Sequence, residues 1–160
     1  MPIVLARIDD RLLHGQVATT WVRATDTQVI VVVDDKLPND PVQVKVLKVA
    51  TPPSTKVYVM EPEKLADKMK QGILDKYNVM LIFAGVEAPL RLLEAGIKLE
   101  SINVGGMRFR EGRKQLAKTI SMTEEERGIA RRIAEMGVEL EHRQVFSDKK
   151  VDVLPMLDNI

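Results

Sequence analysis

The chain has 160 residues, of which 45% are hydrophobic and 29% charged, a composition typical of one globular domain spanning residues 1–160. Its 24 lysines and arginines nearly balance its 23 aspartates and glutamates, which argues against a broad nucleic-acid-binding surface. The chain has no cysteine, which excludes disulfides, thiol catalysis and cysteine-ligated zinc, and its two histidines argue against a histidine-rich metal site. No apolar stretch reaches membrane-spanning length and no signal-peptide pattern opens the chain, so we expect a cytoplasmic protein.

Apolar runs rich in β-branched residues alternate along the chain with segments of helical periodicity. In chain order, strands are predicted over residues 3–8, 28–33, 56–60, 78–83, 101–104 and 138–142, with an edge strand over 115–121. Helices are predicted over residues 13–23, 40–50, 61–72, 89–96 and 123–137. The last of these opens with Thr123 and Glu126 at capping-box spacing.

The segment over residues 40–50 fits two structures. Val42, Val44 and Val46 alternate as in a strand, whereas Pro41 directly after Asp40 is typical of a helix start with an N-cap. We favour the helix.

Strands that alternate with helices predict an α/β fold: a three-layer sandwich with a mostly parallel sheet, helices on both faces and an antiparallel edge. Ligands of such sheets bind outside the carboxyl ends of the strands. His14, Asp34, Gly85 and Gly105 each follow a predicted strand, so we expect them to gather at that edge.

His14 stands where a helix is predicted to begin, just after the first strand. A helix N-terminus attracts phosphate through its free N–H groups, and Arg11 adds a cationic fork suited to phosphate oxygens. A neutral imidazole at this place is a nucleophile for a phosphoryl group, and Gly15 leaves room for close approach. The alternative is a histidine that only caps the helix or fills a surface gap. Asp9 or Asp10 either caps the helix or holds an imidazole N–H.

Two further groups have a functional and a structural interpretation. Gly105 and Gly106 follow a strand and either cradle an anion or form a tight turn. Asp34 and Asp35, taken with the first aspartate pair, either bind Mg²⁺ or are solvated strand ends. Neither a dinucleotide-binding glycine fingerprint nor a P-loop is present, which disfavours nucleotide binding by those routes.

The segment RIDDRLLHGQV over residues 7–17 closely resembles the active-site segment of the IIB components of the mannose/fructose/sorbose type, which belong to the bacterial sugar phosphotransferase system. The resemblance covers essentially the whole chain. Supporting segments are VVDD over residues 32–35, NDP over 39–41, NVGGM over 103–107, RQV over 143–145 and SDKK over 147–150.

The resemblance implies a phosphotransferase that relays a phosphoryl group through His14, with Nδ1 as the acceptor atom. A IIA partner carrying phosphohistidine donates the group, and a sugar bound by membrane-embedded IIC and IID partners receives it. It therefore implies association with the inner face of the membrane through the permease, no cofactor, no metal and no nucleic acid, and it leaves room for a homo-oligomer. The nearness of the motif to Met1 favours a free-standing protein over a IIAB fusion.

Site roles are expected in four groups. Arg11 stabilises the phosphate and Asp10 orients the imidazole or caps the helix. The phosphate-binding loop comprises Asp9, Leu12, Leu13, Gly15 and Gln16; second-loop contacts come from Asp34, Gly85, Gly105 and Gly106; and partner docking involves Arg7, Arg108 and Arg110. The rival hypothesis is a receiver-like module phosphorylated on Asp34 or Asp35 with Mg²⁺, although no acceptor aspartate closes the third strand at Met60.

Overall fold

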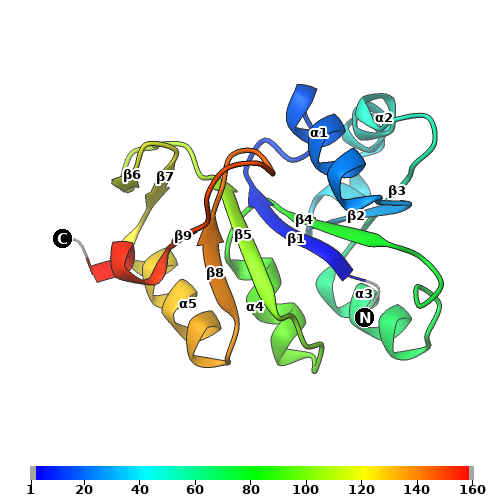
Figure 1. The fold of residues 1–160 in the computed structure, drawn as a ribbon. Coiled ribbons are helices and arrows are strands. Elements are labelled where there is room, and N and C mark those ends of the chain that lie inside the picture. Colours follow the sequence, from blue (N-terminus) through cyan, green and yellow to red (C-terminus); the bar gives the residue numbers. More distant parts are fainter. Residues whose placement is uncertain (1–2, 159–160) are drawn as a thin grey trace.

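The computed structural model describes residues 3–158, and its centre is a seven-stranded sheet (Figure 1). The strands lie in the order β3-β2-β4-β1-β5-β8-β9, and all neighbours pair in parallel except β8 and β9. Their bounds are β1 (Ile3–Asp9), β2 (Val29–Val33), β3 (Lys56–Met60), β4 (Val79–Phe83), β5 (Ser101–Gly106), β8 (Glu139–His142) and β9 (Val151–Asp152). The chain moves from β1 to one side of the sheet and later from β4 to the other, so the strand order reverses beside β1.

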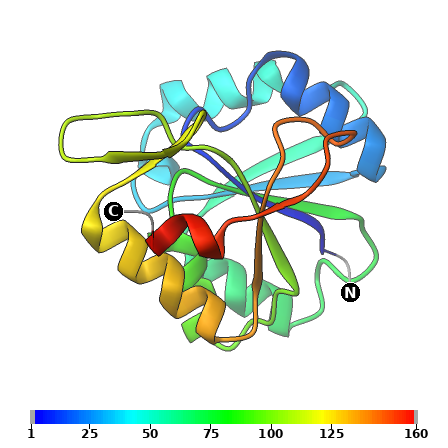
Figure 2. The same ribbon diagram turned by 60° about the vertical axis from the view of Figure 1, so that its left-hand side comes forward.

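Helices cover both faces of this sheet, as Figures 1 and 2 show. Helices α1 (Gly15–Thr25) and α2 (Pro41–Ala50) pack on one face, and α3 (Pro62–Lys70), α4 (Glu87–Glu94) and α5 (Glu124–Glu135) on the other. Two short 3₁₀ helices, η1 (Leu37–Asn39) and η2 (Leu154–Asp158), complete the chain. The predicted three-layer α/β sandwich is therefore confirmed.

Strands β2 and β4 are apolar at every position because both of their faces are buried. In β2, Val29, Val31 and Val33 face the α3–α5 layer, whereas Ile30 and Val32 face α1 and α2. The same alternation in β1 sends Ile8 to the α3–α5 side and therefore Arg7 and Asp9 to the α1 side. This periodicity places the charged end of β1 beneath the loop that carries His14.

The ambiguous segment is a helix, as predicted. The Asp40 side chain accepts a hydrogen bond from the Gln43 backbone N–H, Pro41 occupies the first turn, and Leu47 is buried. Helix α4 begins at Glu87, two residues before the predicted start at Pro89. Proline is tolerated there because N–H groups in a first turn have no partner within the helix.

Three boundary predictions are wrong. Residues 115–121 are not one edge strand but a separate antiparallel hairpin, β6 (Lys114–Ala117) and β7 (Ile120–Met122). The antiparallel edge of the main sheet is instead β9, so residues 138–142 do not form the last strand. Gly105 and Gly106 lie inside β5 rather than in a turn after it, because pairing with β1 extends as far as Asp9 and Gly106.

No helix within residues 3–158 is both long enough and apolar enough to cross a lipid bilayer.

Candidate active site

The loop between β1 and α1 is a tight turn at the carboxyl edge of the sheet. The Leu12 N–H donates to the Asp9 carbonyl at 2.9 Å, and Leu12 adopts a left-handed conformation with φ of 59°. Leu13 is buried in the apolar layer beneath α1, so it anchors the turn. His14 follows in extended conformation as the N-cap residue of α1, and Gly15 opens the helix. The turn thus fixes the backbone position from which the His14 side chain extends.

Asp9 is the centre of the site, and it is fully buried. Its Oδ2 lies 3.2 Å from His14 Nε2 and accepts a hydrogen bond from Arg7 Nη2, also at 3.2 Å. Its Oδ1 accepts the Arg11 backbone N–H at 3.0 Å. A buried carboxylate with three such partners is held in a fixed orientation.

This contact fixes the tautomer of His14. An ionised carboxylate can only accept hydrogen bonds, so the proton of a neutral His14 lies on Nε2, which donates it to Asp9. The lone pair is then on Nδ1. The side chain of His14 is 24% exposed, so a ligand from solvent can reach it. Asp9, and not Asp10, is therefore the aspartate that holds the imidazole.

Arg7 is 3% exposed, which corrects the expectation that it docks a partner. Its guanidinium donates to Asp9, to the Asn103 side chain and to the carbonyls of Arg143 and Gln144, and it stacks 5.1 Å from the centre of the Trp21 ring. Burial lowers the pKa of Arg7, and neighbouring Asp9 opposes that shift. Arg7 is a buried counter-ion that holds Asp9 in place.

The two glycines at the end of β5 make room for this pair. A Cβ on Gly105 would lie 2.1 Å from Arg7 Cζ, a distance that no side chain tolerates, while a Cβ on Gly106 would meet Asp9 Oδ1 at 3.5 Å. Gly105 therefore stands in contact with the guanidinium itself. This steric role was not among the two interpretations, an anion cradle or a tight turn, that the sequence offered for these glycines.

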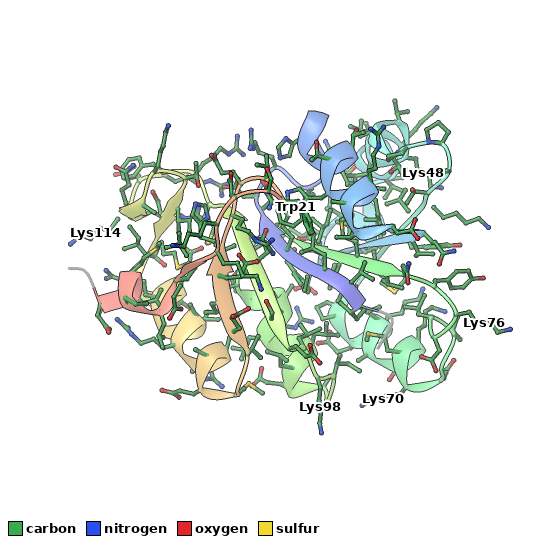
Figure 3. The ribbon with its side chains drawn as sticks, viewed as in Figure 1. Trp21, Lys48, Lys70, Lys76, Lys98 and Lys114 are labelled. Carbon is green, nitrogen blue, oxygen red and sulfur yellow. The ribbon has the colours of Figure 1, made fainter. Side chains whose placement is uncertain are left out.

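A polar row extends from Arg7 across three parallel strands. Arg7, Asn103 and Glu141 are register partners on β1, β5 and β8, and Asn103 Nδ2 donates to Glu141 Oε1 at 3.1 Å. Glu141 in turn binds Arg143 at 2.9 Å. Trp21 of α1 lies against this row (Figure 3) and donates from Nε1 to the Gln144 carbonyl at 3.0 Å. Each side chain of the row is thus linked to the next, although Arg7 Nε has no hydrogen-bond partner among the residues that the structure describes. Asn103 and Glu141 were not expected in the site.

Asp10 points away from His14, which corrects its expected role in orienting the imidazole. Its carboxylate accepts the Arg108 backbone N–H at 2.9 Å and Nε at 3.2 Å. Arg110 and Arg113 approach it to 3.7 Å and 3.5 Å. Asp10 therefore ties the β1–α1 loop to the segment that leads into the β6–β7 hairpin.

Arg11 is the cation at the mouth of the site. Its side chain is about half exposed, and its Nε lies 3.7 Å from Asp9 Oδ1, which leaves the outer guanidinium nitrogens toward solvent. Gln16 lies in the first turn of α1, but its side chain is outside the described part of the structure. Cation, helix N-terminus and imidazole meet within one short loop, as a site for an anion requires.

Comparison with known proteins identifies the family and the fold of this chain. Residues 3–160 match the family described as PTS system sorbose subfamily IIB component. The chain belongs to this family. The IIB chain is 34% identical over 160 residues to the fructose-specific EIIB component of Bacillus subtilis (strain 168) and covers 98% of that protein. It is 37% identical to the mannose-specific EIIAB component of Escherichia coli (strain K12), of which it spans 50%.

Solved structures agree. The IIBSor domain of the sorbose permease from Klebsiella pneumoniae superposes with a TM-score of 0.94 at 35% identity, over 99% of this chain and 98% of that one. The IIB chain therefore has the fold of its family over the residues that the structure describes.

The predicted second-loop residues of the IIB chain, where the structure gives their contacts, interact with residues other than His14. Asp34 Oδ2 accepts the backbone N–H groups of Lys36 and Leu37, both at 2.9 Å, and so holds the turn that leads into η1. Asp35 pairs with Arg91, and Gly85 contacts Glu87. Within residues 3–158, no three or more His, Asp or Glu side chains gather as a metal-binding group. The two aspartate pairs thus have separate partners rather than a common pocket.

Proposed function

We propose that this IIB chain is a phosphoryl carrier. Nδ1 of His14 attacks the phosphorus of a phosphohistidine on a IIA partner, so that a new N–P bond forms while the donor's N–P bond breaks. The oxygen of a sugar hydroxyl bound by membrane-embedded IIC and IID partners then bonds to phosphorus while the N–P bond at His14 breaks. The hydroxyl proton passes to solvent, and Nδ1 regains its lone pair. The observation that carries this proposal is the 3.2 Å contact between His14 Nε2 and the buried carboxylate of Asp9.

Asp9 supports the nucleophile in two ways. It keeps the proton on Nε2, and it offsets the positive charge that the ring acquires when Nδ1 bonds to phosphorus. Its own charge is neutralised by buried Arg7, so it repels an incoming phosphoryl group less than an isolated carboxylate would.

Arg11 and the N-terminus of α1 supply positive potential for the phosphoryl oxygens. Phosphoryl transfer depends mainly on positioning and charge stabilisation, and both are built into this loop.

Arg11→Ala is expected to slow transfer by about 100-fold through loss of one charged contact, with the acceptor still present. Time courses of phosphorylation measure this, and an unchanged rate would show that the guanidinium is dispensable.

The relay requires two successive partners at the same edge of the sheet. Exposed Arg108 and Arg110 lie beside the loop and favour approach of an acidic surface. In this role the chain works at the cytoplasmic face of the membrane, held there by the permease.

The direct test is intact-mass spectrometry after incubation with a phosphorylated IIA protein. Wild type is expected to gain one phosphoryl group that is lost in acid and survives base, as a phosphoramidate does. His14→Ala is expected to stay unmodified and to keep its circular dichroism spectrum. Phosphate on His14→Ala that base removes would contradict the proposal and point to Asp34 or Asp35.

A further inference from the structure

A groove of about 360 Å³ opens beside the His14 loop. It lies between the end of β5, the β6–β7 hairpin and the segment after β8, and the hairpin is the yellow-green arm in Figure 2. Arg11 lines it, whereas His14 does not. The groove is thus next to the proposed acceptor and separate from it.

Three exposed cations from different segments converge on this groove. Arg11 comes from the β1–α1 loop, Arg108 follows β5, and Lys118 lies in the turn between β6 and β7. None of the lining residues is an aspartate or glutamate. Arg108 donates its backbone N–H and its Nε to the Asp10 carboxylate, so the outer nitrogens of its guanidinium are left for another acceptor. A multiply charged anion fits such a cluster better than a neutral ligand.

The hairpin turn that brings Lys118 into place is fixed rather than loosely attached. The Met107 N–H donates to the Thr119 carbonyl at 2.9 Å, and the Ser121 N–H donates to the Met107 carbonyl at 2.8 Å. Thr119 Oγ1 also lies 3.4 Å from the Gly105 carbonyl. Because the turn is bonded to the end of β5, the groove has a built wall.

The rest of the lining suits a ligand with hydroxyl groups. Gln115, Ser121 and Gln144 contribute neutral polar groups that can both donate and accept hydrogen bonds. Phe109 adds an aromatic side chain that is 69% exposed and offers an apolar surface to the C–H face of a ring. A small-molecule site combines an apolar surface with a few polar groups in this way, and its volume falls in the usual range.

We infer that this groove binds a phosphorylated monosaccharide, with the phosphate on Arg11, Arg108 and Lys118 and the sugar ring against Phe109. The assignment of that ligand as the product of transfer rests on the proposed function. Because the ligand shares Arg11 with the phosphoryl site, a bound sugar phosphate is expected to compete with phosphorylation of His14.

The test is an NMR titration of the unphosphorylated full chain with glucose 6-phosphate, with glucose and inorganic phosphate in parallel. Glucose 6-phosphate is expected to shift the amide signals of residues 105–109 and 115–121 in a saturable way. We expect it to bind at least about fivefold more tightly than either fragment alone, since both halves of the groove are filled. Equal affinity for inorganic phosphate would reduce the groove to a simple anion site and overturn the inference, as would the absence of saturable shifts.

Matched variants locate the contact. Lys118→Gln removes one charged hydrogen bond and is expected to weaken binding about tenfold, whereas Lys76→Gln, an exposed lysine far from the hairpin (Figure 3), is expected to leave it unchanged. Phe109→Ala is expected to weaken glucose 6-phosphate more than inorganic phosphate. Equal binding by wild type and Lys118→Gln would overturn the assignment.

The same preparations are then mixed with a phosphorylated IIA donor. Phosphorylation of His14 without sugar-phosphate binding would overturn this inference alone. Binding without phosphorylation would overturn the proposed function and the assignment of the ligand as its product.

Discussion

The buried side chain of Asp9 has three partners. It pairs with the Arg7 guanidinium, accepts the backbone N–H of Arg11 and contacts the His14 imidazole. An isolated buried carboxylate would be costly, and each of these partners lowers that cost. Since Asp9 can only accept, its charge and not merely its shape determines which imidazole nitrogen is protonated.

Asp9→Asn tests this role with little change in volume. The amide can present its NH₂ group to the imidazole and so favour the wrong tautomer, and phosphorylation is expected to slow by about 100-fold or more. Phosphorylation kinetics and ¹⁵N NMR of the imidazole measure rate and tautomer together. Asp34→Asn is the matched control and is expected to keep the wild-type rate; a wild-type rate in Asp9→Asn would remove Asp9 from the mechanism.

Gly105→Ala tests the steric fit around Arg7. The added Cβ overlaps the buried guanidinium, so we expect the free energy of unfolding to fall by about 3 kcal/mol, measured by urea denaturation. Gly128→Ala in α5 is the control, because its Cβ meets nothing within 4 Å and alanine favours helix by about 1 kcal/mol. Equal stabilities of the two variants would contradict the close packing at β5.

At the scale of elements, one pair of charged side chains joins the β6–β7 hairpin to the rest of the molecule. Arg113 donates two hydrogen bonds to Glu126 of α5, at 3.0 Å and 2.9 Å, and lies 3.5 Å from Asp10. Glu126 also completes the capping box of α5 with Thr123. The capping box was predictable from its spacing, whereas the pairing of Arg113 with Glu126 and Asp10 was not, because these carboxylates come from other elements of the fold.

The ion pair between Arg113 and Glu126 makes the free energy of unfolding depend on pH. Burial alone would raise the pKa of Glu126, but hydrogen bonds from Arg113 and Thr123 outweigh it, so the pKa lies below its ordinary value of 4.5. The lowered pKa means that the stabilisation is present above pH 4.5 and is lost as the pH falls through the folded-state value. Glu126→Gln is expected to lower the free energy of unfolding at pH 7 by about 1 to 2 kcal/mol.

Urea denaturation at pH 7 and about pH 3 measures this, since the window spans the ordinary carboxyl pKa. Wild type is expected to lose more stability on acidification than Glu126→Gln. An equal loss in both proteins would show that Glu126 is not one of the groups that titrate with folding.

At the scale of the whole molecule, the two faces of the sheet differ in what covers them. Helices α3, α4 and α5 cover one face. On the other face, α1 and α2 pack mainly on β2 and β4, and Trp21 of α1 reaches the segment after β8. Polar side chains such as Asn103 and Glu141 are therefore accommodated there in a paired row. The loop that carries His14 lies at the Arg7 end of that row.

Local signals explain which parts were predictable. Continuous apolar runs predict the buried strands and therefore the layers of the fold. The Asp40–Pro41 pair predicts a helix start, because an N-cap side chain binds N–H groups close to it in sequence. The strands of the hairpin and β9 are two to four residues long, and runs that short show no clear period in the sequence. An asparagine between Ile102 and Val104 was the available sign of the buried polar row, since a polar residue inside an apolar strand needs a partner.

The site followed the same division. The placement of His14 and Arg11 in one loop before a helix was predictable because the strand end, the cation, the histidine and the helix start are neighbours in sequence. The assignment of Asp9 rather than Asp10 to the imidazole was not, because it depends on the pleat of β1 and on Arg7 beneath it.

The most direct test of the mechanism is ¹H–¹⁵N NMR of the IIB chain labelled at histidine and phosphorylated by a IIA donor. Because Asp9 binds Nε2, phosphorus coupling is predicted at Nδ1 of His14, with the proton retained on Nε2. Coupling at Nε2 of His14 would mean that the contact with Asp9 is broken or irrelevant during transfer, and would contradict the mechanism at its centre.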